Sequence, residues 1–326
     1  MDILILGGTA FLGRAIANEA VARGHGVTCL ARGTEPAPAG VTFIAADRDE
    51  EDGLVGVAGR RWDAVIDVSR QPGQVRRAVR DLDTRHWVFV STGNVYAAFD
   101  RPEQSEDSPL LEPLECDVME SMEDYGPAKV ACERAVSGAT ASATIVRSGL
   151  IGGPGDASGR TGYWPWRFAS PTGDDVIAPD DLGFPVALID VRDLASWLVT
   201  AAEQRIDGVF NATGPKTTLG EVLDASRQVA HSSAALRLIP LDRMTELGVA
   251  EWMGPRSMPL WIADPEWRWF ATLGTDRARA AGLVTRPLAD TLADTLGYEL
   301  TREVPRQAGL ADEEEREVRR ALDAAG

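Results

Sequence analysis

Residues 2–13 read DILILGGTAFLG, and this stretch decides the fold. The apolar run over residues 2–6 is typical of a buried strand, and an amphipathic pattern over 12–23, ending at Gly24, indicates a helix. Glycines allow a tight turn and let a phosphate group approach the backbone, while the amides at the start of a helix attract negative charge. The stretch therefore predicts a strand, a phosphate-binding turn and a helix.

The first half of the chain continues this alternation. Further strands are expected at residues 27–30, 41–45, 64–68, 87–91 and 144–147, with helices at 75–82 and 124–138. Apolar strands that alternate with amphipathic helices are typical of an α/β fold, a doubly wound parallel sheet of the Rossmann type. We expect residues 1–150 to form the dinucleotide-binding domain, to which residues 188–215 return with a helix (192–203) and a strand (208–211).

The remaining segments, residues 151–187 and 216–326, are expected to form a smaller, mainly helical substrate lobe. Residues 152–185 are rich in Gly, Pro and aromatic side chains, and the pattern from residue 217 onward is mostly helical. The last stretch, Asp312 to Ala325, predicts an amphipathic helix with glutamates in its first turn, where they favour the helix dipole.

Charge and composition exclude several classes of partner. The chain has 33 basic and 50 acidic residues and a net charge of -17, a field that repels the phosphate backbone of a nucleic acid. No apolar run approaches the length that a membrane span needs, and no basic region precedes the first strand. We therefore expect a cytoplasmic enzyme without a nucleic-acid or membrane partner and without a signal peptide.

The cysteines and histidines do not form a metal-binding pattern. Cys29, Cys116 and Cys132 lack CxxC spacing, and the three histidines are scattered among polar neighbours. The sequence predicts reduced thiols and no metal site.

A tyrosine, a lysine and a Ser-Thr pair carry the expected chemistry. Tyr125 and Lys129 are four residues apart, one turn from each other on a helix, so that the ammonium can lower the pKa of the phenol. Ser91 and Thr92 end an earlier strand. A phenol with a lowered pKa can move a proton near neutral pH.

The order of these motifs resembles the short-chain dehydrogenase/reductase superfamily, in its extended branch, the NAD-dependent epimerase/dehydratase family. The superfamily turn GxxGxxG is matched at Gly7 and Gly13, with Ala10 in the middle position. The resemblance covers about residues 1–215 and implies that Tyr125 exchanges a proton with the substrate oxygen, while Lys129 also bonds the nicotinamide ribose.

Within this resemblance, the catalytic Ser or Thr lies four residues before the Tyr of a Val-Tyr pair. Counting back from Tyr96 gives Thr92, and Ser91 is the competing choice. Asp47 and Arg48 match the adenine-contacting position, although Asp47 can equally cap a helix. The expected cofactor-binding residues are Gly7, Thr9, Ala10, Phe11, Leu12, Gly13, Arg32, Asp47, Arg48, Val68, Ser69, Ser91, Lys129 and Ser148.

The end of the second strand bears on which nicotinamide cofactor is used. NAD-selective sites usually place an acid there to hold the ribose 2′-hydroxyl, but this strand ends Leu30-Ala31-Arg32-Gly33 and no carboxylate comes before Glu35. Arg32 can bind a 2′-phosphate and stack on adenine, or it can be a solvated loop arginine. NADP(H) is favoured over NAD(H).

The expected function is an NADP(H)-dependent oxidoreductase that acts on a carbonyl or secondary alcohol of a small, partly apolar molecule. Relatives that act on nucleotide sugars usually carry an arginine before the stretch matched here by residues 189–195, and residues 183–188 contain no basic residue. The alternatives are an epimerase or dehydratase that retains its cofactor, and a catalytically silent NADP(H)-sensing protein. A small-molecule substrate is the expected partner, with a homodimer as the assembly to consider.

Overall fold

The computed structural model describes residues 1–324, which divide into two compact units. The first unit consists of Met1–Gly149, Val191–Thr213 and Leu273–Val284, and the second of Leu150–Asp190, Gly214–Thr272 and the chain from Thr285 onward. The expected boundary at residue 216 would put residues 273–284 in the substrate lobe. Their contacts join them to the first unit, where Leu273 packs against Gly93 and the Ala281 carbonyl accepts a hydrogen bond from Trp197 Nε1 (3.0 Å).

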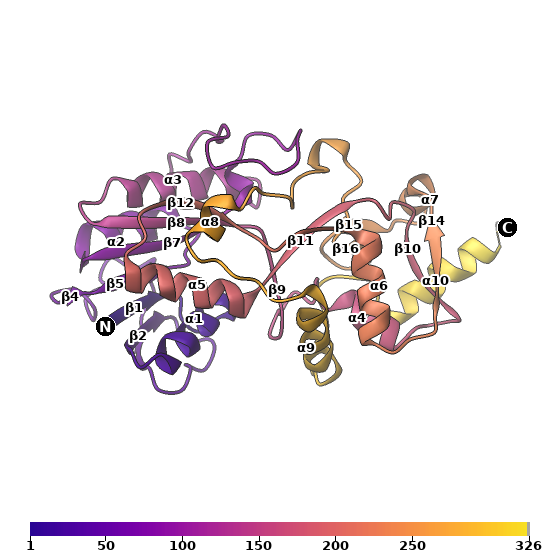
Figure 1. Ribbon diagram of the computed structural model, residues 1–326, viewed down its shortest axis with the longest axis horizontal. Coiled ribbons are helices and arrows are strands. Elements are labelled where there is room, and N and C mark those ends of the chain that lie inside the picture. Colours follow the sequence, from indigo (N-terminus) through magenta and orange to yellow (C-terminus); the bar gives the residue numbers. More distant parts are fainter. Residues whose placement is uncertain (325–326) are drawn as a thin grey trace. The chain divides into compact units, whose positions relative to one another are not determined.

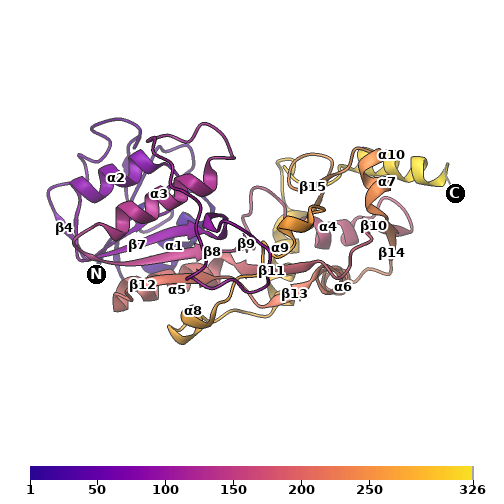
Figure 2. The same ribbon diagram turned by 90° about the horizontal axis from the view of Figure 1, so that it is seen from above.

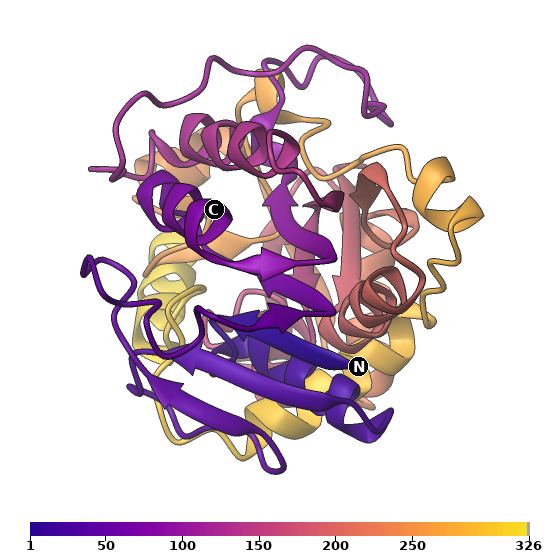
Figure 3. The same ribbon diagram turned by 90° about the vertical axis from the view of Figure 1, so that its left-hand side faces the viewer.

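The first unit is built on a seven-stranded, wholly parallel sheet in the order β12-β8-β7-β5-β1-β2-β3, which confirms the predicted fold class (Figure 3). Its strands are β1 (Asp2–Leu6), β2 (Gly26–Ala31), β3 (Thr42–Ala45), β5 (Ala64–Asp67), β7 (His86–Thr92), β8 (Ser142–Ser148) and β12 (Gly208–Ala212).

Helices cover both faces of this sheet. Figures 2 and 3 show α1 and α5 on one face and α2 and α3 on the other. The helices of this unit are α1 (Phe11–Ala22), α2 (Pro72–Asp81), α3 (Tyr125–Ser137), α5 (Val191–Gln204), α8 (Asp276–Ala280) and the 3-10 helix η1 (Gly93–Val95), and a short strand pair joins β4 (Arg61–Trp62) to β6 (Asp83–Thr84). Helix α2 begins at Pro72, earlier than the expected residue 75, because proline is readily accommodated in a first helical turn.

The central strands have their side chains buried on both faces. Ile3, Leu4, Ile5 and Leu6 are 0% exposed, and Trp87 and neighbouring apolar side chains pack on the face beneath α2 and α3. A parallel sheet with helices on both sides has no solvated face, which is why its strands read as continuous apolar runs. The carboxyl ends of β1, β2 and β5 consequently meet at one edge.

The second unit contains more strands than the sequence predicted (Figure 1). Its elements are β9 (Leu150–Gly152), α4 (Tyr163–Ala169), β10 (Asp175–Pro179), β11 (Pro185–Asp190), β13 (Lys216–Thr218), α6 (Leu219–Val229), β14 (Ala235–Ile239), α7 (Leu241–Glu246), β15 (Ala250–Trp252), β16 (Ser257–Pro259), the 3-10 helix η2 (Pro265–Trp267), α9 (Leu288–Leu300) and α10 (Asp312–Asp323). The expectation of a mostly helical pattern after residue 217 missed three strands of three to five residues, which are too short to show a clear period.

Helix α10 is attached to the second unit by ion pairs. The predicted helix over 312–325 is present as Asp312–Asp323, and Ala325 lies outside the described residues. Buried Glu315 pairs with Arg167 of α4 (Nε to Oε2, 2.7 Å), and Arg319 pairs with Asp175 of β10. Because its charged inner face has partners on α4 and β10, this very polar helix can pack against a folded unit.

Candidate active site

The glycine turn after β1 is shaped by one residue with a positive φ and by two close approaches. Gly7 has a φ of +96°, a backbone conformation that residues other than glycine rarely adopt. A Cβ at Gly8 would lie 2.4 Å from Cys29 Sγ, and a Cβ at Gly13 would lie 2.0 Å from the Gly7 carbonyl oxygen. Glycine is therefore required at all three positions for α1 to begin directly over the end of β1. In the middle position, Ala10 has an ordinary extended backbone as the N-cap of α1.

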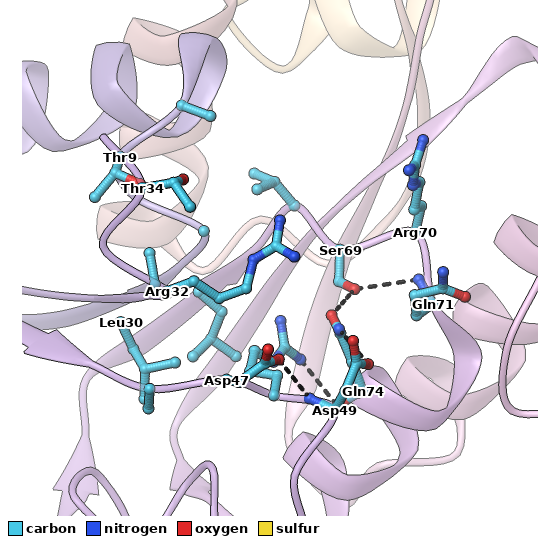
Figure 4. Close-up of a pocket in the computed structure, with 17 residues that line it drawn as sticks. Thr9, Leu30, Arg32, Thr34, Asp47, Asp49, Ser69, Arg70, Gln71 and Gln74 are labelled. Carbon is cyan, nitrogen blue, oxygen red and sulfur yellow. Dashed lines mark hydrogen bonds between the residues drawn. The ribbon is translucent and has the colours of Figure 1, made fainter. Parts of the chain in front are cut away.

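A cavity of about 430 Å³ opens beside this turn (Figure 4). Eight predicted cofactor-binding residues line it, namely Gly7, Thr9, Ala10, Arg32, Asp47, Arg48, Val68 and Ser69. They come from the ends of β1, β2, β3 and β5, four neighbouring strands of the sheet. In open α/β sheets, ligands bind outside the carboxyl ends of the strands, so the position and lining of the cavity suit the adenosine and phosphate part of a dinucleotide.

Phe11, Leu12 and Gly13, which were also predicted to contact the cofactor, do not line this cavity. They form the first turn of α1, where Gly13 is buried against the Gly7 carbonyl. The motif that contains them thus shapes the turn.

Arg48 has a structural partner that the sequence analysis did not identify. Its guanidinium forms two hydrogen bonds of 2.8 Å with the carboxylate of Asp67 at the end of β5, and Nη2 also donates to the Gln74 carbonyl (2.9 Å). The side chains are 8% and 0% exposed. Arg48 lines the cavity and ties the segment after β3 to β5, because its Nη1 and Nη2 atoms donate to groups on or after β5.

Polar residues missed by the sequence analysis complete this wall. Ser69 Oγ donates to Gln74 Oε1 (2.6 Å), and Gln74 Nε2 donates to Asp49 Oδ1 (2.8 Å). Arg70 and Gln71 line the same cavity. Short sequence patterns do not identify such residues, because the bonds join different elements: Gln74 lies in α2 and Asp49 follows β3.

Arg32 is exposed and differs from Arg48 in its surroundings. Within residues 1–324 its guanidinium has neither a hydrogen bond nor an ion pair. Figure 4 shows the side chain crossing the cavity from the end of β2. A free guanidinium at this position is available to an anionic ligand.

The predicted catalytic residues all lie in the first unit. Thr92 ends β7 and caps η1, because its Oγ1 accepts from Asn94 N (3.2 Å) and donates to Asn94 Oδ1 (2.9 Å). Tyr125 is the first residue of α3, and Gly126 beside it lets the helix approach η1: a Cβ there would lie 2.4 Å from the Asn94 carbonyl oxygen. The glycine between Tyr125 and Pro127 therefore brings the start of α3 against the turn that carries Thr92.

Lys129 is buried one turn further along α3, with 2% of its surface exposed. Its Nζ donates to the carbonyls of Ser69 (2.7 Å) and Val90, and it lies 4.2 Å from the centre of the Phe89 ring. Burial lowers the pKa of Lys129 to about 8. The ammonium thus connects the ends of β5 and β7 to the helix that carries Tyr125.

Two predicted cofactor contacts, Ser91 and Ser148, are engaged within the protein. Ser91 Oγ donates to Glu133, whose carboxylate pairs with Arg147 (2.8 Å), and Ser148 Oγ donates to the Ser91 carbonyl (2.9 Å). All four residues are buried, and none lines the cavity. In this structure their polar groups hold α3, β7 and β8 together, because each hydroxyl already has an internal acceptor.

Other features bear on what the site can hold. Among the described residues, no group of three or more His, Cys, Asp and Glu side chains is placed to bind a metal ion. No helix in residues 1–324 is long and apolar enough to cross a bilayer.

Cys29 and Cys132 are buried, and burial raises the pKa of the two thiols to about 11 and about 12.

The parallel sheet, the glycine turn and the cavity beside it define a Rossmann-type nucleotide-binding protein. Residues 3–79, which include that turn, match the model of the NAD dependent epimerase/dehydratase family. The chain is also 27% identical over 237 residues to the Epimerase family protein SDR39U1 of Bos taurus, an alignment that covers 67% of this chain and 76% of that protein.

Solved structures share the fold at low sequence identity. A protein of Burkholderia cenocepacia J2315 aligns with 92% of this chain and 98% of its own at a TM-score of 0.71 and 19% identity. The UDP-glucose 4-epimerase of Thermus thermophilus, solved in complex with NAD, aligns with 93% of this chain and 100% of its own at a TM-score of 0.62 and 20% identity.

These comparisons confirm the resemblance predicted from the sequence. The chain is similar to the NAD-dependent epimerase/dehydratase family of the extended short-chain dehydrogenase/reductases, and the prediction of an NAD(P)-dependent enzyme agrees with that family.

Proposed function

We propose that this protein is an NADP(H)-dependent oxidoreductase that interconverts a carbonyl and a secondary alcohol on a small, partly apolar molecule. The observation that carries the proposal is Arg32, an unpaired guanidinium that lines the cavity at the end of β2 within the described residues. The first carboxylate after that strand is Glu35, which does not line the cavity. A 2′-phosphate suits this position better than a free 2′-hydroxyl, because the segment that follows β2 has an arginine where an NAD-selective site has an acid.

The proposed chemistry divides between a hydride and a proton. When bound, the reduced nicotinamide supplies the hydride for the carbonyl carbon. Tyr125 donates its phenol proton to the carbonyl oxygen, and Thr92 holds that oxygen in place with its hydroxyl. Lys129 stabilises the phenolate that remains, since its ammonium lies on the same helix one turn away.

This mechanism requires a rotation of the Thr92 hydroxyl and an unused proton on Lys129. The Thr92 proton points to Asn94 Oδ1 in the structure, so the hydroxyl rotates when it binds a substrate oxygen. Lys129 has three protons and donates to two backbone carbonyls, which leaves one for the ribose of the cofactor. We infer that ligand binding completes the arrangement, as is common for catalytic hydrogen bonds.

A turnover assay tests the proposed reaction. The purified protein is incubated with NADPH and a panel of aldehydes and ketones, and the loss of the reduced nicotinamide is followed by absorbance. Stoichiometric conversion of NADPH and substrate supports an oxidoreductase. An altered substrate without net NADPH oxidation contradicts it.

The second candidate is an epimerase or dehydratase that keeps its cofactor and returns the hydride to the substrate. The fold likeness to the Thermus thermophilus UDP-glucose 4-epimerase favours this reading. The lack of a basic residue in positions 183–188 argues against a nucleotide-sugar diphosphate at that place. Product analysis with UDP- and dTDP-sugars decides between the two, and light scattering of the same sample reports whether the protein is a homodimer.

A further inference from the structure

The cavity beside the glycine turn contains a second arginine to which the sequence analysis gave no role. Arg70 follows β5, is exposed, and lines the cavity. Like Arg32, it has neither a hydrogen bond nor an ion pair within the described residues. Exposed arginines elsewhere, such as Arg134 and Arg205, also have no carboxylate partner within the described residues, so the significance of Arg32 and Arg70 depends on where they lie. Two such arginines on one cavity indicate an anionic ligand.

The two arginines flank the phosphate-binding turn. In the sheet, β1 lies between β5 and β2, and Leu6 is aligned with Asp67 on one side and Leu30 on the other. Arg32 comes two residues after Leu30, and Arg70 comes three residues after Asp67. Gly7, which follows Leu6, therefore has one arginine on each side. In the view of Figure 4, Arg32 reaches toward the middle of the cavity, and Arg70 extends upward on the other side of Ser69.

The backbone before Arg70 is held by hydrogen bonds, whereas the Arg70 side chain has none within the described residues. Ser69 N donates to Asp67 Oδ1 (2.8 Å), Ser69 Oγ donates to Gln74 Oε1 (2.6 Å), and the Ser69 carbonyl accepts from Lys129 (2.7 Å). Arg70 thus starts from a well-defined point at the cavity rim. The long, positively charged side chain can therefore contact a ligand, and the backbone that carries it needs little further ordering.

The acidic residues of the cavity do not neutralise these arginines. Asp49 Oδ1 accepts from Gln74 Nε2 (2.8 Å), and Asp47 Oδ1 accepts from Asp49 N (2.9 Å). Within the part of the chain that the structure describes, neither carboxylate forms an ion pair with Arg32 or Arg70. An NADP(H) molecule carries its charge at two places, the pyrophosphate and the 2′-phosphate, so each arginine has an anionic counterpart.

We propose that Arg70 binds the pyrophosphate, the group that NAD(H) and NADP(H) share, while Arg32 binds the 2′-phosphate. This assignment rests on the proposed binding of a dinucleotide in the cavity. It makes Arg70 a determinant of affinity for both cofactors and Arg32 the determinant of the preference between them. Lys129 donates a hydrogen bond to the carbonyl of Ser69, the residue directly before Arg70. The proposed pyrophosphate contact and the proposed catalytic lysine are therefore joined through Ser69.

Binding titrations of single variants test the assignment. Arg70→Gln, Arg32→Gln and the control Arg134→Gln are each titrated with NADPH, NADH, ADP and AMP by calorimetry. Arg134 is a suitable control because it is also exposed, lies in the same unit, and is absent from this cavity. Arg70→Gln is expected to weaken NADPH and NADH by the same factor, about tenfold, as for the loss of one charge-assisted contact. It should weaken ADP more than AMP.

The other variants separate this inference from the choice of cofactor. Arg32→Gln should weaken NADPH and leave NADH unchanged, and Arg134→Gln should change neither. If Arg70→Gln weakens NADPH alone, Arg70 reads the 2′-phosphate and the assignment is overturned, as it is if no affinity changes. If the unaltered protein binds NADH and NADPH equally, the proposed cofactor preference fails, while the effect of Arg70→Gln on NADH still decides the role of Arg70.

Discussion

At the scale of single residues, the site depends on glycines at which a side chain would clash and on a charged side chain that has no internal partner. Gly13 is needed because the Gly7 carbonyl lies where a methyl group would be. Arg32 is available because no carboxylate contacts it within residues 1–324. Tyr125 begins α3 against the turn of Thr92 because Gly126 allows the approach.

The first prediction concerns the proton carrier. Tyr125→Phe removes only a hydroxyl, so the fold and the affinity for NADPH should change little, while turnover falls by about a hundredfold or more. Thr92→Ala should also lower turnover with little change in cofactor affinity. Steady-state kinetics with an accepted carbonyl substrate provide the measurement. Normal turnover by Tyr125→Phe would make the sensor reading the better one.

The second prediction concerns the buried lysine. Burial lowers the pKa of Lys129 from 10.5 to about 8, so between these pH values the unfolded chain binds more protons than the folded one. The stability of the folded state should therefore rise across this window, by about 3 kcal/mol for the full shift. Lys129→Met should lack this rise, which denaturant titrations at neutral pH and near pH 10.5 can measure.

The same shift can be measured directly by NMR. The chain contains only two lysines, Lys129 and Lys216, so spectra of the protein labelled at lysine carbons hold two titrating signals. Lys216→Arg identifies the remaining one. A Lys129 signal that titrates near its ordinary value would show that the ammonium is solvated in solution.

The third prediction concerns the close approach at Gly13. A methyl group there would lie 2.0 Å from a backbone oxygen, so Gly13→Ala must displace the start of α1. Overpacking of this kind costs about 1–3 kcal/mol, and NADPH affinity should fall with it. Gly297→Ala is the control, since Gly297 lies within α9 with open space around it and should gain stability. Equal thermal stability of Gly13→Ala and the unaltered protein would contradict the packing seen here.

At the scale of elements, strand ends are joined by buried polar groups. The Arg48–Asp67 pair connects the segment after β3 to β5, and Lys129 connects α3 to the ends of β5 and β7. Glu133 and Arg147 join α3 to β8 in the same way. These bonds hold the strand ends that form the cavity in one arrangement.

The fourth prediction tests that connection. Asp67→Asn leaves the Arg48 guanidinium buried without its counter-charge, which should cost about 3 kcal/mol of unfolding free energy. The double variant Arg48→Met, Asp67→Leu removes both charges and should recover part of that loss. NADPH affinity should be reduced in both variants because Arg48 lines the cavity. If the double variant is no more stable than Asp67→Asn, the pair does not act as a coupled unit.

Much of the first unit could be predicted from the sequence, because its signals are local. The apolar run of β1, the glycine turn and the periodicity of α1 and α5 each lie within a short window, and the structure contains these elements to within a residue or two. The partners of Arg48 and Ser91 could not be predicted. Asp67 and Glu133 lie 19 and 42 residues away, and only the sheet order brings them together.

At the scale of the whole molecule, the candidate site lies in the first unit, and the second unit has a hydrophobic core of its own. The first unit contains the glycine turn, the cavity and all three predicted catalytic residues. The second has a core of its own that includes Tyr163, Trp164 and Trp261, with short strands that the sequence did not reveal. Tyr163 and Trp164, which belong to the aromatic-rich segment 152–185, are 1% and 0% exposed, so they fill the interior.

The fifth prediction concerns the substrate. A protein without a basic residue in positions 183–188 should neither bind nor turn over UDP- and dTDP-sugars. Calorimetric titration of each sugar nucleotide, with NADPH present, provides the measurement. Binding at micromolar concentration with conversion of the sugar would establish the epimerase reading instead.

The most direct test of the central claim is a comparison of the dissociation constants for NADPH and NADH, measured by fluorescence titration of the unaltered protein and of Arg32→Asp. Arg32 is exposed and has no partner among the described residues, so its replacement leaves the fold intact. We predict that the unaltered protein binds NADPH about tenfold or more tightly than NADH, as expected for a charge-assisted contact with the 2′-phosphate, and that Arg32→Asp removes or reverses this preference. Equal affinities in the unaltered protein, or a preference that survives in Arg32→Asp, would contradict the account.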